Sequence, residues 1–423
     1  MQAQVINFGC RVNAIEQFHM GELLDTSDHD TSNVIVVNSC AVTAEAERQL
    51  QQRLRKLRKT HPEKRIILSG CAAQLRPEFY GASDDVDHVI GNHEKLLPHT
   101  WSQQNLQAND PERRVQVGDI MQRNMLARDV MARFGGRARA FVQVQTGCDH
   151  RCTFCTIPFA RGNSHSFSLD DITAQIREFV SNGYQEVVLS GIDIASFRTP
   201  QKGLGGLINH ILDTVPALPR LRISTLDCID VDEDFLRALA HQPRLMPHVH
   251  LSLQSGDDMI LKRMKRRHLR NQAQDFIAKM REARPDLVLG ADIIAGFPTE
   301  TEAMFENTLE FVRSNKISWL HVFPYSERPG TPAAKIPKQV PRKIRLARAK
   351  HLRHVGKEIA AHTLQKRIGA LSEVVIERDN IGKDPYYCQA QVIADAPLAA
   401  GSRVPVKVMG VQDRQLHATY LGA

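Results

Sequence analysis

The chain has 423 residues, which exceeds the size at which one hydrophobic core usually stops growing, so two or three domains are expected. Its formal charge is +8, which favours a polyanionic partner. The start lacks a basic segment followed by a long apolar run, and no segment approaches about 18 apolar residues. We therefore expect a cytoplasmic protein that is neither secreted nor bound within a membrane.

The first hundred residues alternate between short apolar runs and amphipathic segments. Strands are expected at residues 4–8, 34–38 and 66–69, with helices near residues 12–24 and 44–59 between them. Strands that alternate with helices form parallel sheets. The pattern predicts an open parallel α/β domain over residues 1–104.

Each of these predicted strands is followed at once by a cysteine, namely Cys10, Cys40 and Cys71. Parallel strands would bring the three thiols to one carboxyl edge, where open α/β sheets bind ligands. We expect a three-ligand metal site there. The alternative is that small cysteine side chains simply fit tight strand ends.

Residues 105–136 are polar and irregular, with Asn109-Asp110-Pro111 and Gly135-Gly136 as turn signals. Such a composition is typical of a linker between domains. A weak alternation over residues 114–117 allows a hairpin within it.

Residues 137–358 resume the strand-helix alternation. Six strands are predicted, at residues 140–145, 186–190, 221–224, 249–253, 288–295 and 319–325. Six such units suit an incomplete parallel (β/α)6 barrel, whose chemistry should lie at the carboxyl ends of its strands.

A tight cysteine loop follows the first of these strands, with Cys148, Cys152 and Cys155 spaced Cys-x3-Cys-x2-Cys. Three thiolates can hold three irons of a four-iron cluster and leave the fourth iron open. Structural zinc needs a fourth protein ligand, for which His150 or His165 is available, but the paired zinc spacings do not match.

Other strand ends carry groups that suit a small polar cofactor. Glycine lets a ligand approach the backbone, and serine and glutamine can bind ribose, amino or carboxylate groups. A turn alone would also explain Gly191 and Gly296. The candidate cofactor-binding residues are Ser190, Gly191, Ser252, Gln254 and Gly296.

Basic residues gather in three runs, over residues 48–59, 262–268 and 335–357. Each run alone is compatible with a solvated face. Together they favour RNA or DNA, because a phosphate backbone releases counterions when basic residues bind it.

The tail, residues 359–423, is rich in β-formers and predicts five short strands of a small nucleic-acid-binding barrel. Tyr386 and Tyr387 could stack on an unpaired base or close a core. Cys228 and Cys388 stand alone and are expected to be ordinary thiols.

The loop from Cys148 to Cys155 resembles the signature of the radical S-adenosylmethionine superfamily. Three cysteines ahead of such a barrel, with the segments at residues 38–48, 69–74 and 323–331, resemble the methylthiotransferases of that superfamily over nearly the whole chain. Residues 41–48 and 159–164 are most similar to the branch that acts on N6-threonylcarbamoyladenosine 37 of tRNA.

The resemblance implies two [4Fe-4S] clusters and S-adenosyl-L-methionine as cofactors. Cys148, Cys152 and Cys155 would act in catalysis by holding the cluster that cleaves this cofactor to a radical, while Cys10, Cys40 and Cys71 would hold the second cluster. The tail would be a TRAM domain, attached to a radical SAM core. Implied partners are the tRNA anticodon loop, an external one-electron reductant and a sulfur source, with the protein a monomer.

Three other functions fit the same features. They are methylthiolation of N6-isopentenyladenosine 37, methylthiolation of a ribosomal-protein aspartate, and a non-enzymatic role as an iron-sulfur RNA-binding or redox-sensing protein. Two departures from the family pattern are a short connection between Cys10 and Cys40, and Thr156 in place of an aliphatic residue.

Overall fold

The computed structural model describes residues 3–27, 29–106, 114–122, 137–229 and 231–422. It divides into two compact units. The first contains residues 1–128, 145–165 and 326–334, and the second contains residues 129–144, 166–325 and 335–423. The Cys148–Cys155 loop therefore groups with the N-terminal residues, a division that differs from the domain boundaries expected from the sequence. Among the described helices, none combines the length and apolar character needed to cross a bilayer.

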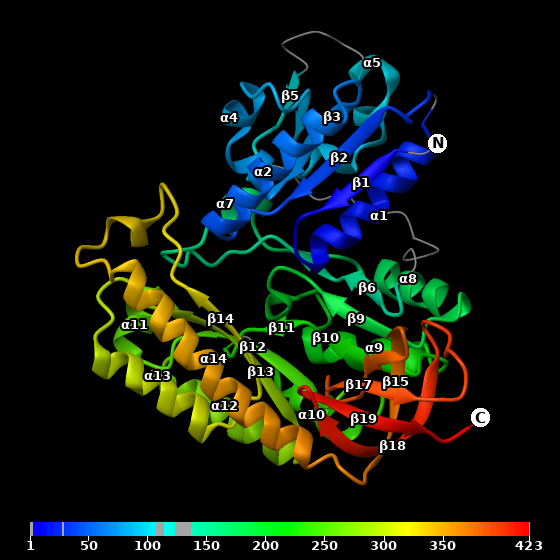
Figure 1. Ribbon diagram of the computed structural model, residues 1–423, viewed down its shortest axis with the longest axis vertical. Coiled ribbons are helices and arrows are strands. Elements are labelled where there is room, and N and C mark those ends of the chain that lie inside the picture. Colours follow the sequence, from blue (N-terminus) through cyan, green and yellow to red (C-terminus); the bar gives the residue numbers. More distant parts are fainter. Residues whose placement is uncertain (1–2, 28, 107–113, 123–136, 230, 423) are drawn as a thin grey trace. The chain divides into compact units, whose positions relative to one another are not determined.

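The first unit is built on a parallel five-stranded sheet in the order β1-β2-β3-β4-β5. The interior strand β2 is buried throughout, as the apolar run at its start predicts. Figure 1 shows these strands in blue to cyan. Their bounds are β1 (Gln4–Asn7), β2 (Val34–Ser39), β3 (Arg65–Gly70), β4 (His88–Ile90) and β5 (Val115–Gln116).

The helix that follows β2 begins at a side-chain cap. Thr43 caps α2 by accepting a hydrogen bond from the Ala46 amide, and Leu50, Leu54 and Leu57 bury one face of that helix. The helices are α1 (Arg11–Asp25), α2 (Ala44–Thr60), α3 (Cys71–Leu75), α4 (Pro77–Gly81), α5 (Gln103–Leu106) and α7 (Ile157–Arg161), with 3-10 turns η1 (Glu94–Leu96) and η2 (Pro98–Trp101).

The sheet extends beyond the expected boundary at residue 104. Residues 115 and 116, which the sequence assigned to the linker, form β5 and pair in parallel with β4. The hairpin considered for this stretch is wrong, because the pairing is parallel and its partner is a distant strand. Residues 107–113 and 123–136 of the expected linker lie outside the described residues.

The second unit carries the six predicted strand positions as parallel strands in two linked sheets. The third predicted strand is divided at Ser224, so that β10 pairs with β9 and β11 pairs with β12. The strands are β6 (Ala140–Gln143), β9 (Glu186–Ser190), β10 (Arg220–Ile223), β11 (Thr225–Leu226), β12 (His248–Gln254), β13 (Val288–Ala295) and β14 (Trp319–Pro324). The short strands β7 (Gln145–Thr146), in the first unit, and β8 (His165–Ser166), which spans residues of both units, flank the cysteine loop.

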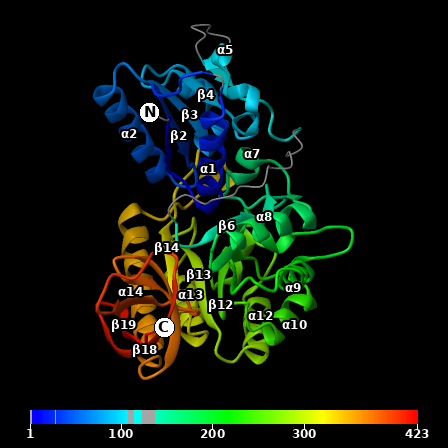
Figure 2. The same ribbon diagram turned by 90° about the vertical axis from the view of Figure 1, so that its right-hand side faces the viewer.

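Helices cover the outer side of these strands. Figures 1 and 2 show α12, α13 and α14 along β12, β13 and β14. Side-chain caps fix several helix starts, including Ser168 before α8 and Asp232 before α10. The helices are α8 (Leu169–Ser181), α9 (Leu204–Thr214), α10 (Glu233–His241), α11 (Asp258–Arg263), α12 (Arg270–Ala283), α13 (Glu302–Ser314) and α14 (Arg342–Gln365), with 3-10 turn η3 (Ile194–Ser196); the turn η4 (Pro332–Lys335) spans residues of both units.

The tail forms a closed five-stranded barrel in the order β15-β16-β17-β19-β18, which confirms the predicted all-β module. The expected boundary at residue 358 falls inside α14, so this helix runs without a break from the core toward the barrel. Figure 2 shows the barrel in orange and red. Its strands are β15 (Leu371–Arg378), β16 (Ile381–Lys383), β17 (Gln389–Ile393), β18 (Arg403–Gln412) and β19 (Gln415–Tyr420).

A buried ionic cluster joins this barrel to the core within the second unit. Glu186 of β9 binds Arg222 of β10 at 2.8 and 3.1 Å and lies 3.7 Å from Arg139. Arg222 also donates to the Asp384 and Pro385 carbonyls of the barrel, at 3.2 and 3.1 Å. Burial opposes ionisation of Glu186, but the arginines outweigh it and lower the pKa of this carboxyl.

We expect Glu186→Gln to destabilise the metal-free protein by about 3–5 kcal/mol at pH 7, because it leaves buried arginines without their carboxylate. The lowered pKa means that this stabilisation is present above the ordinary value of 4.5 and is lost as the pH falls through the lower folded value. Calorimetry of wild type and variant should show a difference that shrinks below pH 4.5. The exposed Glu306→Gln serves as control, and an equal effect of both changes would contradict the prediction.

Candidate metal centres

The three N-terminal cysteines lie at the carboxyl edge of the first sheet, as the sequence predicts. Cys10 precedes α1, Cys40 follows β2, and Cys71 opens α3 directly after β3. Because β1, β2 and β3 are neighbouring parallel strands, their ends meet at one edge. The exposure of the thiols is graded, since Cys10 is exposed, Cys40 is half-buried and Cys71 is buried.

Polar side chains tie these strand ends together. The Cys10 thiol donates to the Asn13 Oδ1 at 3.3 Å, and the Asn13 amide donates to the Ser39 carbonyl at 3.0 Å. The Ser39 hydroxyl accepts from the Ala72 amide at 3.2 Å. Gly70 has a φ of +94°, and a Cβ there would lie 2.4 Å from the Ser39 carbonyl oxygen, so glycine permits the close approach of β2 and β3.

The three thiols influence one another. Burial is the main cause that raises the pKa of Cys40 to about 11, and negative charge on Cys71 and on Cys10 acts in the same direction. Burial also raises the pKa of the Cys10 thiol, so Cys10 and Cys40 stay protonated at neutral pH unless a cation replaces their protons. Three converging sulfur ligands without a carboxylate ligand suit a soft metal or an iron-sulfur cluster.

A buried charged cluster lies beneath this triplet. Arg161, at the end of α7, donates its Nε–H to the Cys71 Sγ at 3.3 Å and binds Glu16 through both terminal nitrogens. Lys95 donates to the same Glu16 carboxylate at 2.6 Å and to the Asn92 Oδ1 at 2.7 Å. The side chains of Glu16 and Lys95 are fully buried and that of Arg161 is 2% exposed.

The pKa shifts in this cluster have opposite directions. Burial lowers the pKa of Lys95 to about 8, although Glu16 opposes the shift. Burial also disfavours the charged guanidinium of Arg161, but Cys71 and Glu16 outweigh it and raise the pKa of Arg161. Arg161 therefore stays charged, and Lys95 is mostly charged at neutral pH.

The second triplet sits on the loop between β7 and α7. The Cys148 amide donates to the Gly162 carbonyl at 3.0 Å, and the Ile157 amide donates to the Cys155 Sγ at 3.4 Å. Gly147 has a φ of +68°, and a Cβ there would lie 1.9 Å from the Asn163 carbonyl oxygen. Glycine is thus required for the loop to fold back on residues 162–164.

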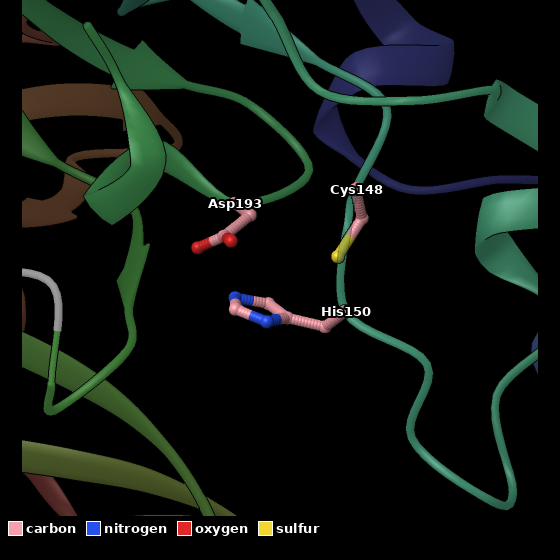
Figure 3. A group of neighbouring side chains, drawn as sticks. All are labelled: Cys148, His150 and Asp193. Carbon is pink, nitrogen blue, oxygen red and sulfur yellow. The ribbon is translucent and has the colours of Figure 1, made fainter. Parts of the chain in front are cut away.

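The three cysteines of this loop are half-buried. Arg151 bridges it by donating to the Cys148 carbonyl at 2.8 Å and to the Asn163 Oδ1 at 2.9 Å. Figure 3 shows Cys148 and His150 projecting to the same side of the loop, and it also labels Asp193, which comes from the segment after β9. The local geometry presents Cys148, Cys152 and Cys155 from one short segment, as their spacing predicts.

The residues expected to bind S-adenosylmethionine lie on strands of the second unit. Ser190 ends β9 and Gly191 follows it, while Ser252 and Gln254 lie at the end of β12. β9 and β12 lie in the two linked parallel sheets of this unit, and within each sheet the carboxyl ends of the strands face one edge. Gln254 has a φ of +69°, a conformation rare for a residue with a side chain and often found at functional positions.

Gly296 has a structural explanation. It follows β13 with a φ of +73°, its amide donates to Glu300 at 2.8 Å, and a Cβ there would lie 3.0 Å or less from atoms of Arg345. The turn and the packing of α14 both require glycine. Its proposed contact with the cofactor has no separate support from this geometry.

Sequence reasoning missed two polar clusters. Asn13 and Glu16 follow Cys10 at helical spacings of three residues, a signal that could have placed them under the triplet. In the second unit, Asp292 lies 3.1 Å from the His250 Nε2 and 3.3 Å from the His321 Nδ1. Burial would raise the pKa of Asp292, but the two imidazoles lower it to about 2. These three residues could hold a cation.

The buried charges around Glu16 lead to a prediction about stability. Glu16→Gln leaves Lys95 and Arg161 without a counterion, so we expect a loss of about 3–5 kcal/mol in the metal-free protein. The indole of Trp101 donates to the Lys95 carbonyl at 3.0 Å, so its fluorescence during urea denaturation reports on this region. Trp319→Phe in all samples removes the second tryptophan.

Glu45→Gln is the matched control, because Glu45 is 56% exposed and its ion pair with Arg48 should contribute less than about 1 kcal/mol. Equal midpoints for Glu16→Gln and Glu45→Gln would show that the buried cluster does not stabilise the unit.

Two family models match the chain. Residues 142–312 match the model described as Radical SAM superfamily, and residues 2–91 match the model described as Uncharacterized protein family UPF0004. The first match contains the Cys148 triplet, and the second contains Cys10, Cys40 and Cys71.

A solved structure shows the same fold at low identity. It is the radical S-adenosylmethionine methyltransferase TsrM from Kitasatospora setae, with a TM-score of 0.56 and 13% identity over 78% of this chain and 76% of that one. At this identity the likeness concerns the fold alone.

Curated relatives match over nearly the full length. The Threonylcarbamoyladenosine tRNA methylthiotransferase MtaB of Rickettsia prowazekii is 42% identical over 98% of this chain and 96% of its own, and that of Thermotoga maritima is 32% identical over 93% and 91%. The tRNA-2-methylthio-N(6)-dimethylallyladenosine synthase of Ehrlichia canis is 30% identical over 97% of both chains. The chain therefore belongs to the radical SAM methylthiotransferase family.

Proposed function

We propose that this enzyme methylthiolates C2 of N6-threonylcarbamoyladenosine at position 37 of tRNA, in the cytoplasm. The observation that carries the proposal is the 42% identity to a relative of that name over nearly the whole chain. Relatives named for dimethylallyladenosine match at 30–33% identity, so isopentenyladenosine 37 is the second candidate substrate.

The thiol geometry supports two clusters, each with three protein ligands. When bound, a four-iron cluster with S-adenosylmethionine supplies a carbon radical, and the second cluster supplies sulfur. Cys148, Cys152 and Cys155 would fix the first cluster on the loop that Gly147 folds back. Cys10, Cys40 and Cys71 would fix the second at the sheet edge, where the graded burial of the thiols leaves the Cys10 side open to solvent.

A groove in the second unit supports an RNA partner. A cavity of about 500 Å³ is lined by β14, α14 and the C-terminal barrel, and its walls carry Arg353, Lys357, Lys383 and Arg414. Arg353, Lys357 and Arg414 are exposed. A basic, partly aromatic groove suits a phosphate backbone with unpaired bases.

Other basic residues and the paired tyrosines have structural partners. Arg348 binds Glu300 and Glu302. Tyr387 stacks on His248 with ring centroids 4.8 Å apart, and Arg367 covers Tyr386 at 3.9 Å. These contacts favour the core-closing role of the two tyrosines over base stacking.

Iron content and products test the two-cluster proposal. Anaerobically reconstituted wild type should carry about eight irons per chain, and Cys71→Ala should lose about four of them. Cys71→Ala should also lose the methylthio nucleoside, while Cys148→Ala should lose 5′-deoxyadenosine. Cys388→Ala, at a buried cysteine of the C-terminal barrel, is the control and should keep the full iron content.

The substrate is tested with one panel of unmodified, isopentenylated and threonylcarbamoylated tRNA and ribosomal protein. The proposal expects product from threonylcarbamoylated tRNA. Product from isopentenylated tRNA or ribosomal protein alone would assign the substrate to a different branch of the family. Full cluster loading without 5′-deoxyadenosine formation would favour a redox-sensing or RNA-binding protein.

Removing positive charge from the groove should weaken the binding of every tRNA, whatever its nucleotide sequence. The slope of log affinity against log salt concentration is negative. In the double variant Lys357→Gln and Arg414→Gln its magnitude should decrease by about 0.7–0.9 for each phosphate that the groove no longer neutralises. Binding is measured by fluorescence anisotropy at several salt concentrations. The control is Arg237→Gln, which removes a positive charge at an exposed position on α10, outside the groove. Unchanged slopes for the groove variant would place the RNA elsewhere.

A further inference from the structure

We propose that Arg161 is a positioning residue for the N-terminal cluster. It donates a hydrogen bond to the Cys71 ligand, and its positive charge balances the negative charge of the cluster. The inference rests on the proposed second cluster. It assigns a role to a residue that supplies no cluster ligand.

The placement of Arg161 links the two cysteine triplets. It ends α7, the helix that starts two residues after Cys155, and its Nε lies 3.3 Å from the Cys71 Sγ. Its terminal nitrogen also donates to the Asn13 Oδ1 at 3.1 Å, the same oxygen that accepts from Cys10. One side chain from the segment that carries Cys148, Cys152 and Cys155 is thus hydrogen-bonded to the N-terminal triplet.

Glu16 pairs with two cations, Lys95 and Arg161, although one would neutralise it. Lys95 already neutralises Glu16 at 2.6 Å, and it is fully buried with that carboxylate. With Arg161 added, the charged side chains joined by these contacts, apart from the thiols of the triplet, are two cations and one anion, which is an excess of one positive charge. Burial of an unbalanced charge is costly, so the excess indicates a negative partner in the assembled protein.

A cluster at the triplet would be that partner. A four-iron core held by three thiolates has a net charge of about −1, and one-electron reduction makes it about −2. The one excess positive charge near the cluster balances the charge of the oxidised form. It stabilises the reduced form more strongly, because that form carries one more negative charge. A hydrogen bond to a ligand sulfur acts in the same direction, because it stabilises added negative charge.

Two substitutions change the charge in opposite directions. Arg161→Met removes the hydrogen bond and one positive charge, and it leaves the neutral Glu16–Lys95 pair intact. We expect the N-terminal cluster of this variant to have a more negative midpoint potential than that of wild type. At a pH low enough to keep Lys95 protonated without Glu16, Glu16→Gln adds one net positive charge, and we expect a less negative potential. Arg161→Lys keeps the positive charge, so its midpoint potential should lie close to that of wild type.

The measurement is a redox titration of the reconstituted full-length protein, monitored by electron paramagnetic resonance. A second set, in which Cys148, Cys152 and Cys155 are all alanine, identifies the signal of the N-terminal cluster. Arg48→Met is the matched control, since Arg48 is an exposed arginine of the same unit that pairs with Glu45. A merely structural role of Arg161 would alter iron loading without moving the two potentials in opposite directions.

The outcomes separate this inference from the proposed function. Equal potentials for wild type and Arg161→Met at full iron content would overturn the inference and leave the two-cluster proposal intact. Wild-type iron content that Cys71→Ala does not lower would overturn both. If Arg161→Met fails to load the N-terminal cluster, restored loading in Arg161→Lys supports charge balance, and failure of both variants to load contradicts it.

Discussion

Parallel strand register is the constraint on which the N-terminal centre depends. Asn7, Asn38 and Ser69 lie side by side on β1, β2 and β3. The three cysteines follow this row at nearly equal distances, three residues after Asn7 and two after each of the others. Strands of this sheet cannot slip by one residue without turning buried side chains to the opposite face, so the hydrophobic pattern that fixes the register also gathers the thiols.

Buried charge is the second physical theme, and it appears in both units. Glu186 gathers arginines where the C-terminal barrel meets the core, and Glu16 gathers Lys95 and Arg161 beneath the N-terminal triplet. The Glu186 cluster joins two parts of one unit through carbonyls of the barrel. The Glu16 cluster has excess positive charge beside thiols, which points to chemistry as well as to packing.

The helix α14 shows how one segment serves both stability and recognition. Its Arg345 and Arg348 face inward to backbone carbonyls and to Glu300, whereas Arg353 and Lys357 line the groove next to the C-terminal barrel. A run of basic residues in a sequence does not distinguish these roles, because the partners of each arginine come from distant strands and loops. The same holds for Tyr387, whose stacking partner His248 lies on β12.

The sequence by itself determined the Cys148 triplet, the alternation of strands and helices, and the β-rich tail, because each depends on spacing along the chain. It also predicted the convergence of Cys10, Cys40 and Cys71, since parallel strands have a fixed polarity. Tertiary structure alone decided the contact of Arg161 with Glu16, which are 145 residues apart, and the pairing of β5 with β4. No local periodicity encodes such contacts, since they form only when distant segments pack together.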